Sequence, residues 1–118
     1  MSKTLVTGSL AFDYIMDFPG VFAENINPEK LDVLNLSLLI ISLKKSRGGT
    51  AGNISYSLGL LKTPVAILGC VGDEFANYAS ILSNVGVDTT GIKEVEGEST
   101  SSAFIVTDSK QNQIQSFY

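Results

Sequence analysis

The stretch Arg47–Asn53, with the sequence Arg-Gly-Gly-Thr-Ala-Gly-Asn, constrains the fold more than any other feature of the chain. Its three glycines allow the backbone to take positive φ and to approach a ligand or a neighbouring segment closely. Thr50 can cap a helix that begins there, and N–H groups left free at such a helix start bind an anion or a hydroxyl. The stretch therefore predicts a tight turn into a helix beside a ligand.

Strand and helix patterns alternate around this turn. Leu5–Leu10 and Val65–Val71 are apolar runs typical of buried strands, and we expect the second to be covered on both faces. Thr50–Leu61 and Asp73–Val85 have helical periodicity. The side chains expected to face inward are Ala51, Ile54, Leu58 and Leu61 in the first helix and Phe75, Tyr78, Ala79 and Leu82 in the second. Strand, helix, strand and helix with short links predict an α/β sheet with right-handed crossovers.

The remaining segments are predicted less sharply. Gly91–Gly97, Ala103–Val106 and Gln113–Tyr118 fit strands, and the last two are joined by a polar hairpin loop over 107–112. Leu31–Ile40 fits either a strand or the start of a helix. The basic cluster Lys44–Arg47 is predicted to be a solvated loop.

Composition excludes several classes of function. With 44% apolar and 17% charged residues the chain is globular. A net charge of −4 and the lack of a basic stripe with aromatics argue against a nucleic-acid surface. The sequence has no histidine, which excludes Ser-His-Asp and Cys-His catalysis and histidine-bearing zinc sites.

The single cysteine cannot form an internal disulfide, which fits a reducing cytoplasm. We expect Cys70 to be a small buried apolar residue within its strand. Met1–Thr4 shows no signal-peptide pattern, and Val33–Leu43 is too short and too polar to span a bilayer. No membrane partner is therefore expected.

Four ordered blocks of this sequence resemble the ribokinase-like family of sugar and nucleoside kinases, the phosphofructokinase-B type. The blocks are Thr4–Asp13, Gly48–Ser55, Val65–Phe75, and Asn84–Thr89 followed by Ser99–Ala103. They span nearly the whole chain. Phe12–Ile15 and Asn112–Ile114 look most like the adenosine-kinase and bacterial carbohydrate-kinase branch. The chain departs from the family at Lys62, where a Gly or Ser usually forms the tight helix-to-strand turn.

The resemblance implies an α/β fold: the amino-terminal half of a ribokinase-like, Rossmann-type sheet with a small β lid. It implies one partial domain over residues 1–118, with lid elements at 14–45 and 90–98, and favours a strand followed by a short helical turn at Leu31–Ile40. Family members are much longer, and their catalytic Asp lies in a later Gly-Ala-Gly-Asp loop that nothing here matches. We therefore interpret the chain as an amino-terminal, substrate-side portion that is not active alone.

The resemblance also implies a substrate site formed by Asp13, Gly48, Gly49 and Asn53. Asp13 is expected just past the carboxyl end of the first strand, where open α/β sheets bind ligands, and a carboxylate can accept hydrogen bonds from two vicinal hydroxyls. The alternative for Asp13 is a solvated or turn-capping loop residue. Asn53 is as readily a helix-start residue that bonds the loop.

Other chemistry-bearing residues have plainer explanations. Asp73 and Glu74 fit helix capping better than an acid–base pair, and Asp13 with Asp17 is better explained as coincidence than as a metal pair. The aromatic residues Phe12, Tyr14 and Phe22 fit either a base-stacking pocket or packing. Ala11 stands where relatives often carry Asn, which favours a nucleoside over a more polar sugar.

The expected function is therefore the substrate-binding portion of an ATP-dependent sugar or nucleoside kinase that phosphorylates a substrate hydroxyl. ATP and Mg²⁺ would serve the intact enzyme, and neither is expected on this chain alone. Lid strands in the family pair between subunits, which implies a homodimer. The alternative is a non-catalytic ligand-binding or assembly module of the same fold, and a flavodoxin-like nucleotide binder is less favoured. Gly-x-x-x-x-Gly-Lys and Gly-x-Gly-x-x-Gly loops are absent from the sequence.

Overall fold

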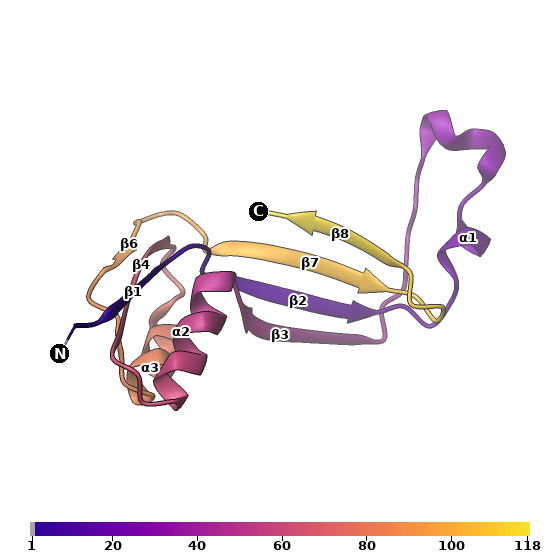
Figure 1. Ribbon diagram of the computed structural model, residues 1–118. Helices are drawn as coiled ribbons and strands as arrows, with labels where there is room; N and C mark the ends of the chain where they lie inside the picture. Colours follow the sequence, from indigo (N-terminus) through magenta and orange to yellow (C-terminus); the bar gives the residue numbers. More distant parts are fainter. Residues whose placement is uncertain (1) are drawn as a thin grey trace. The chain divides into compact units, whose positions relative to one another are not determined.

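The computed structural model describes residues 2–118, which divide into two compact units (Figure 1). The first unit comprises the residues up to Phe12, Arg47–Ser102 and Tyr118. The second comprises Asp13–Ser46 and Ala103–Phe117. The expected single domain over 1–118 is thus subdivided, and a lid over 14–45 falls within the second unit.

A parallel sheet with two helices forms the first unit. Its elements are β1 (Thr4–Thr7), α2 (Thr50–Leu60), β4 (Val65–Val71), α3 (Ala76–Asn84), β5 (Val87–Asp88) and β6 (Ile92–Glu94). The strand β4 pairs in parallel with β1, β5 and β6. Both helices contact the sheet and each other. The predicted α/β sheet is confirmed, and β4 and α2 lie within one residue of their predicted ends.

Only one face of this sheet is covered by the described residues. Val65, Ile67 and Val71 of β4 point to the covered face and are buried, whereas Leu68 and Cys70 on the other face are exposed. Leu5 of β1, paired with Ala66, is exposed on that second face too. The predictions of a strand covered on both faces and of a buried Cys70 are therefore wrong for these residues.

The helix α2 buries a different face from the one its large apolar residues predict. Ala51 is buried as expected, but Ile54 and Leu61 are exposed. The buried positions are otherwise small: Gly52, Ser55 and Gly59. Small residues let this helix approach its neighbours closely, since a Cβ on Gly59 would lie 2.7 Å from the carbonyl oxygen of Val85. In α3 the expected inward residues Tyr78 and Leu82 are buried, as is Phe75 just before the helix.

The turn after α2 keeps its tight geometry despite the lysine at position 62. Lys62 has a φ of 57°, in the left-handed region that favours glycine. Its N–H donates to the Gly59 carbonyl at 2.9 Å, and that of Thr63 donates to the Leu58 carbonyl at 3.0 Å. These two bonds form a Schellman motif. The departure from the family pattern therefore leaves the turn intact and places a lysine in a strained backbone conformation.

A second sheet, with the order β3-β2-β7-β8, belongs mainly to the second unit. Its strands are β2 (Ala11–Asp17), β3 (Ser42–Gly48), β7 (Ser101–Thr107) and β8 (Gln113–Phe117), of which β7 and β8 pair antiparallel. Between β2 and β3 a long connecting segment, residues 18–41, contains α1 (Phe22–Asn25) and the 3₁₀ helix η1 (Pro28–Val33). This segment is called the excursion. The predicted strand at 103–106, the hairpin loop at 107–112 and the strand at 113–118 correspond to β7, the loop and β8.

Three expectations fail in this unit. Asp13 was expected just past the carboxyl end of the first strand but lies within a further strand, β2. Leu31–Ile40 forms no strand; it ends η1 and then runs without regular structure to β3. The basic cluster Lys44–Arg47 is part of the edge strand β3 and not a loop, and its exposed lysines are typical of an edge strand.

Residues 90–98 were expected among the lid elements. The structure instead pairs β6, at Ile92–Glu94, with the carboxyl end of β4 in the first unit. The hairpin of β7 and β8 accompanies residues 13–46 in the second unit. Within residues 2–118, no helix is long and apolar enough to cross a membrane.

Candidate substrate site

The glycine-rich turn joins the end of β3 to the start of α2 and is packed tightly within the first unit. Gly48 is buried, and its carbonyl accepts a hydrogen bond from the Tyr78 hydroxyl at 2.8 Å. Gly49 has a φ of 88°, and a Cβ there would lie 2.4 Å from the carbonyl oxygen of Ser9. A Cβ on Gly52 would lie 1.9 Å from the Tyr78 hydroxyl. Gly49 and Gly52 are therefore required by close approach of their neighbours.

Ser9 accepts hydrogen bonds from the backbone N–H groups at the start of α2. The N–H of Thr50 donates to the Ser9 hydroxyl at 2.9 Å, and that of Ala51 donates to the Ser9 carbonyl at 3.0 Å. The N–H of Gly52 also points to that carbonyl, at 3.4 Å. Gly49 is the N-cap and has no side-chain cap bond. The prediction that Thr50 caps this helix is therefore wrong, and these three N–H groups are used within the protein.

Asn53 lies on the first turn of α2 with its side chain exposed. Its backbone N–H donates to the Gly49 carbonyl at 3.0 Å, which closes the first helical hydrogen bond. The alternative expectation was that Asn53 bonds the glycine-rich loop, and this bond is made by its backbone N–H and not by its side chain. Gly48, Gly49 and Asn53 are consequently brought together in one turn, and the Asn53 amide stays at the surface.

Asp13 belongs to the second unit, as the third residue of β2, and is half-buried. Side chains alternate across a strand, so Asp13, Ile15 and Asp17 share one face of β2. The Asp17 carboxylate accepts a hydrogen bond from the Ser42 hydroxyl of β3. Asp17 therefore joins two strands, which gives it a structural role distinct from a metal pair with Asp13.

Two of the three aromatic candidates for base stacking are packing residues. Phe12 is buried in the first unit, with ring centroids 6.2 Å from Phe75 and 5.8 Å from Tyr78. Phe22 is buried in the second unit and stacks on Phe18 at 5.9 Å. Neither ring is exposed enough to stack on a base.

Tyr14, the third candidate, lies on the sheet of the second unit and stacks on Phe104 with centroids 4.9 Å apart and planes 9° apart. The Lys45 ammonium lies 5.6 Å from the Tyr14 centroid, within the range of a cation–π contact. Both rings are partly exposed. This pair is an aromatic surface that a planar ligand could reach.

Asp73 and Glu74 tie a loop and do not form an acid–base pair. The Asp73 carboxylate accepts from the Gly97 N–H at 3.1 Å, and the Glu74 carboxylate accepts from the Thr100 N–H at 2.8 Å. The Thr100 hydroxyl in turn accepts from the Gly72 N–H at 2.9 Å. The two carboxylates thus hold residues 97–100 to the segment after β4. The helix-capping prediction is wrong, because Phe75 is the N-cap of α3 and no side chain caps that helix.

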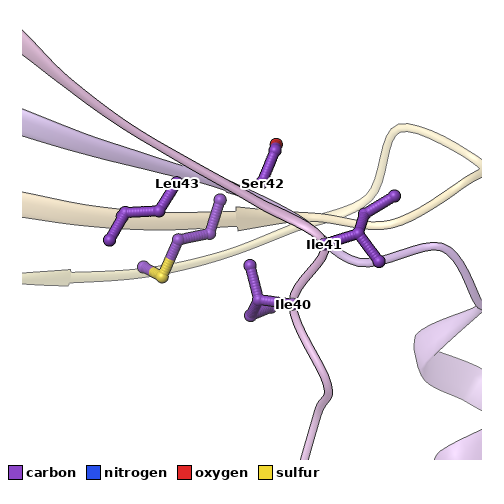
Figure 2. Close-up of a pocket in the computed structure, with 5 residues that line it drawn as sticks. Ile40, Ile41, Ser42 and Leu43 are labelled. Carbon is purple, nitrogen blue, oxygen red and sulfur yellow. The ribbon is translucent and has the colours of Figure 1, made fainter.

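An apolar hollow of about 390 Å³ lies in the second unit where the excursion meets β3 (Figure 2). Its lining residues are Met16, Ile40, Ile41, Ser42 and Leu43. Among residues 2–118, no three His, Cys, Asp or Glu side chains gather closely enough to hold a metal ion.

Residues 10–118 match the pfkB family of carbohydrate kinases. The chain belongs to this family. It is 32% identical over 116 residues to the nucleoside kinase of Methanothermobacter thermautotrophicus, covering 97% of this chain and 34% of that protein. It therefore spans about a third of the length of the curated relatives it matches.

Solved structures of nucleoside kinases are similar to this chain in fold as well as in sequence. The nucleoside kinase of Methanocaldococcus jannaschii, an archaeal member of the ribokinase family, superposes with a TM-score of 0.82 at 32% identity over 100% of this chain and 37% of that one. The Burkholderia thailandensis nucleoside kinase in complex with inosine gives a TM-score of 0.77 at 32% identity, over 97% and 35%. The latter kinase in complex with ADP-inosine gives 0.66 at 34% identity, over 97% and 36%. This pfkB-family chain has the ribokinase-like fold and corresponds to the amino-terminal part of such a kinase.

Proposed function

We propose that this chain is the substrate-binding portion of an ATP-dependent kinase that phosphorylates a hydroxyl of a nucleoside. The observation that carries the proposal is the similarity, over 97% of the chain, to a nucleoside kinase solved with inosine. Ala11, where sugar-binding relatives often carry Asn, fits the same substrate class. A sugar is the alternative substrate class for the same kinase function, since the family as a whole is one of carbohydrate kinases.

In this proposal Asp13, Gly48, Gly49 and Asn53 bind the ribose side of the substrate. An ionised carboxylate discriminates hydroxyl pairs well, because charge-assisted hydrogen bonds are about twice as strong as neutral ones. The exposed Asn53 amide offers both a donor and an acceptor. Residues 14–45 would form the lid that excludes water from the reacting hydroxyl.

ATP would supply the phosphoryl group, with Mg²⁺ neutralising its charge, in the intact enzyme. The chain's own contribution is to bind and orient the acceptor hydroxyl, because phosphoryl transfer depends chiefly on positioning. A cytoplasmic location belongs to the same proposal, since ATP-dependent chemistry and a lone, exposed cysteine both suit a reducing compartment.

Calorimetric titration with inosine, adenosine, ribose and fructose tests this function. Saturable nucleoside binding that Asp13→Asn weakens at least tenfold supports it, since a charged hydrogen bond contributes about 1.5–3 kcal/mol. Glu94→Gln is the matched control: it removes one exposed carboxylate from β6 and should leave affinity unchanged. Tighter binding of ribose or fructose than of nucleosides would move the proposal to a sugar kinase, and equal affinity in the Asp13→Asn variant would remove Asp13 from the site.

An assembly role is the second candidate, and the edge strand β8 favours it. All five of its residues are exposed, with Ile114 and Phe117 among the exposed apolar side chains. An unpaired strand edge of this kind readily pairs with another chain, which would give a homodimer through the lid strands. Sedimentation velocity decides: a concentration-dependent dimer that Ile114→Lys abolishes supports assembly, and a monomer at all concentrations rejects it.

A further inference from the structure

Three hydrogen bonds attach the start of the excursion to the hairpin loop between β7 and β8. They run from Phe18 N to Thr107 O at 2.9 Å, from Ser109 N to Gly20 O at 2.9 Å, and from Phe22 N to Asp108 Oδ2 at 3.0 Å. The first two are backbone bonds that any residue could make. Only the third depends on a particular side chain, and it joins residues 86 positions apart in the sequence.

Asp108 is the most highly bonded side chain of the second unit. It is 2% exposed, and its Oδ1 accepts from the N–H groups of Lys110 and Asn112, each at 2.9 Å. The Asn112 side-chain amide donates to the same carboxylate at 3.1 Å. Burial alone would raise the pKa of Asp108, but the bonds from Phe22, Asn112 and Lys110 outweigh it and lower the pKa to about 2. The group is therefore a buried anion whose oxygens are fully used.

The other end of the excursion is also attached. The N–H of Ile41 donates to the Asp17 carbonyl at 3.0 Å, and the Ser42 hydroxyl donates to the Asp17 carboxylate. Between the two attachments, residues 23–40 stand away from the sheet of the second unit (Figure 1). They carry exposed apolar side chains: Leu31, Val33, Leu34 and Leu39. The direction of this segment is consequently set at its two ends and not by packing along its length.

We propose that Asp108 is a positioning residue that fixes the first end of the excursion, so that residues 23–40 are held ready to cover the bound substrate. The covering role rests on the proposed function, whereas the fixing role rests on the bonds alone. Phe22 is the point of attachment, because its N–H donates to the Asp108 carboxylate while its buried ring stacks on Phe18. Asp108 itself need not touch the substrate.

The test combines NMR order parameters with nucleoside titration on Asp108→Ala. Backbone order parameters of residues 18–25 should fall from about 0.85 to below about 0.6, while those of α2 and β4 stay unchanged. Inosine affinity should fall about tenfold, because the loose segment must then be ordered on binding. Asp88→Ala is the control, since Asp88 caps a comparable turn in the first unit, with its Oδ1 accepting from the Thr90 N–H at 3.1 Å.

Each outcome decides something different. Unchanged order parameters at residues 18–25 overturn the proposal, and so does a loosened segment with unchanged inosine affinity. A loosened segment in a protein whose wild type binds no nucleoside leaves the fixing role standing and rejects the proposed function. Should Asp108→Ala fail to fold, Asn112→Ala removes only one donor to the carboxylate, and it must give the same loosening to a smaller degree.

Discussion

Each of the two units of this protein is stabilised internally by a different kind of interaction. Nearly all the buried apolar side chains belong to the first unit, among them Ile67, Phe75 and Leu82. In the second unit, only Phe22 and Ala103 are buried apolar residues, and a buried carboxylate ties its loops instead. Apolar burial is non-directional and does not depend on any single contact. A buried hydrogen-bond network such as that around Asp108 depends on the presence of every partner. We therefore expect the first unit to respond to side-chain volume and the second to charge.

Substituting the same residue type in both units gives the largest expected contrast. Ile67→Ala empties a fully buried position in β4 and should lower the free energy of unfolding by about 3–4 kcal/mol. Ile114→Ala in β8, where the side chain is 42% exposed, should cost less than about 0.5 kcal/mol. Urea unfolding of both variants measures the difference. Similar losses in the two would show that β8 contributes to a common apolar core.

Acid should weaken the second unit through Asp108. Its pKa is lowered to about 2 in the folded protein, from about 3.9 in an unfolded chain. A lowered pKa means that the ionised group stabilises the fold above about pH 4, and that this stabilisation is lost as the pH falls to about 2. Urea unfolding of the wild type and Asp108→Asn at several pH values measures it.

Acid should also lower the stability of the first unit, because Asp88 has a lowered pKa through its bonds to Lys3 and Thr90. The informative quantity is therefore the stability difference between the wild type and Asp108→Asn. That difference should shrink steadily between pH 4 and pH 2. A constant difference over this range would mean that the Asp108 charge does not stabilise the second unit.

The sequence predicted most of the first unit, because its signals are local. Pro64 ends the first helical pattern, and the apolar run of β4 follows at once, so both elements were located closely. The buried face of α2 was wrong because Gly52, Ser55 and Gly59 are small, and small residues contribute little to an apolar pattern even where close packing selects them. The strand β2 was missed because its two aspartates interrupt the apolar alternation.

The candidate site was predicted only in part, since its decisive contacts are distant in sequence. The glycine turn was recognised from local residues alone. The role of Ser9 was not, because it binds the start of a helix 41 positions later. The one available signal was its place in Gly8-Ser9, directly after the first strand. Asp108 was seen as part of a polar loop, but nothing local marks the Phe22 N–H as its partner.

Among residues 2–118, each unit carries one non-glycine residue with positive φ, which allows a smaller comparison. Lys62 has a φ of 57° after α2, and Gln111 has a φ of 66° in the hairpin loop. Lys62→Gly should stabilise the first unit by about 1 kcal/mol, because glycine takes this conformation without Cβ strain. Gln111→Gly should raise hydrogen-exchange protection in β7 and β8 only. Lys110→Gly, at a position without positive φ, should give no gain, because glycine only adds conformational entropy to the unfolded chain there. A gain there would show that relief of φ strain is not what stabilises Gln111→Gly.

The smallest expected effect concerns the polar groups that the first unit does bury. Ser55 is fully buried, and within the described chain its hydroxyl has no hydrogen-bond partner, whereas the Ser102 hydroxyl donates to the Thr100 carbonyl at 2.9 Å. Ser102→Ala should cost about 1 kcal/mol, the net contribution of one hydrogen bond. Ser55→Ala should change stability by less than about 0.5 kcal/mol or improve it, because it removes an unsatisfied group and keeps the small volume that α2 needs. Thermal unfolding of the two alanine variants compares them directly. A loss from Ser55→Ala as large as that from Ser102→Ala would mean that the Ser55 hydroxyl is hydrogen-bonded in solution and stabilises the first unit as much as the Ser102 hydroxyl does.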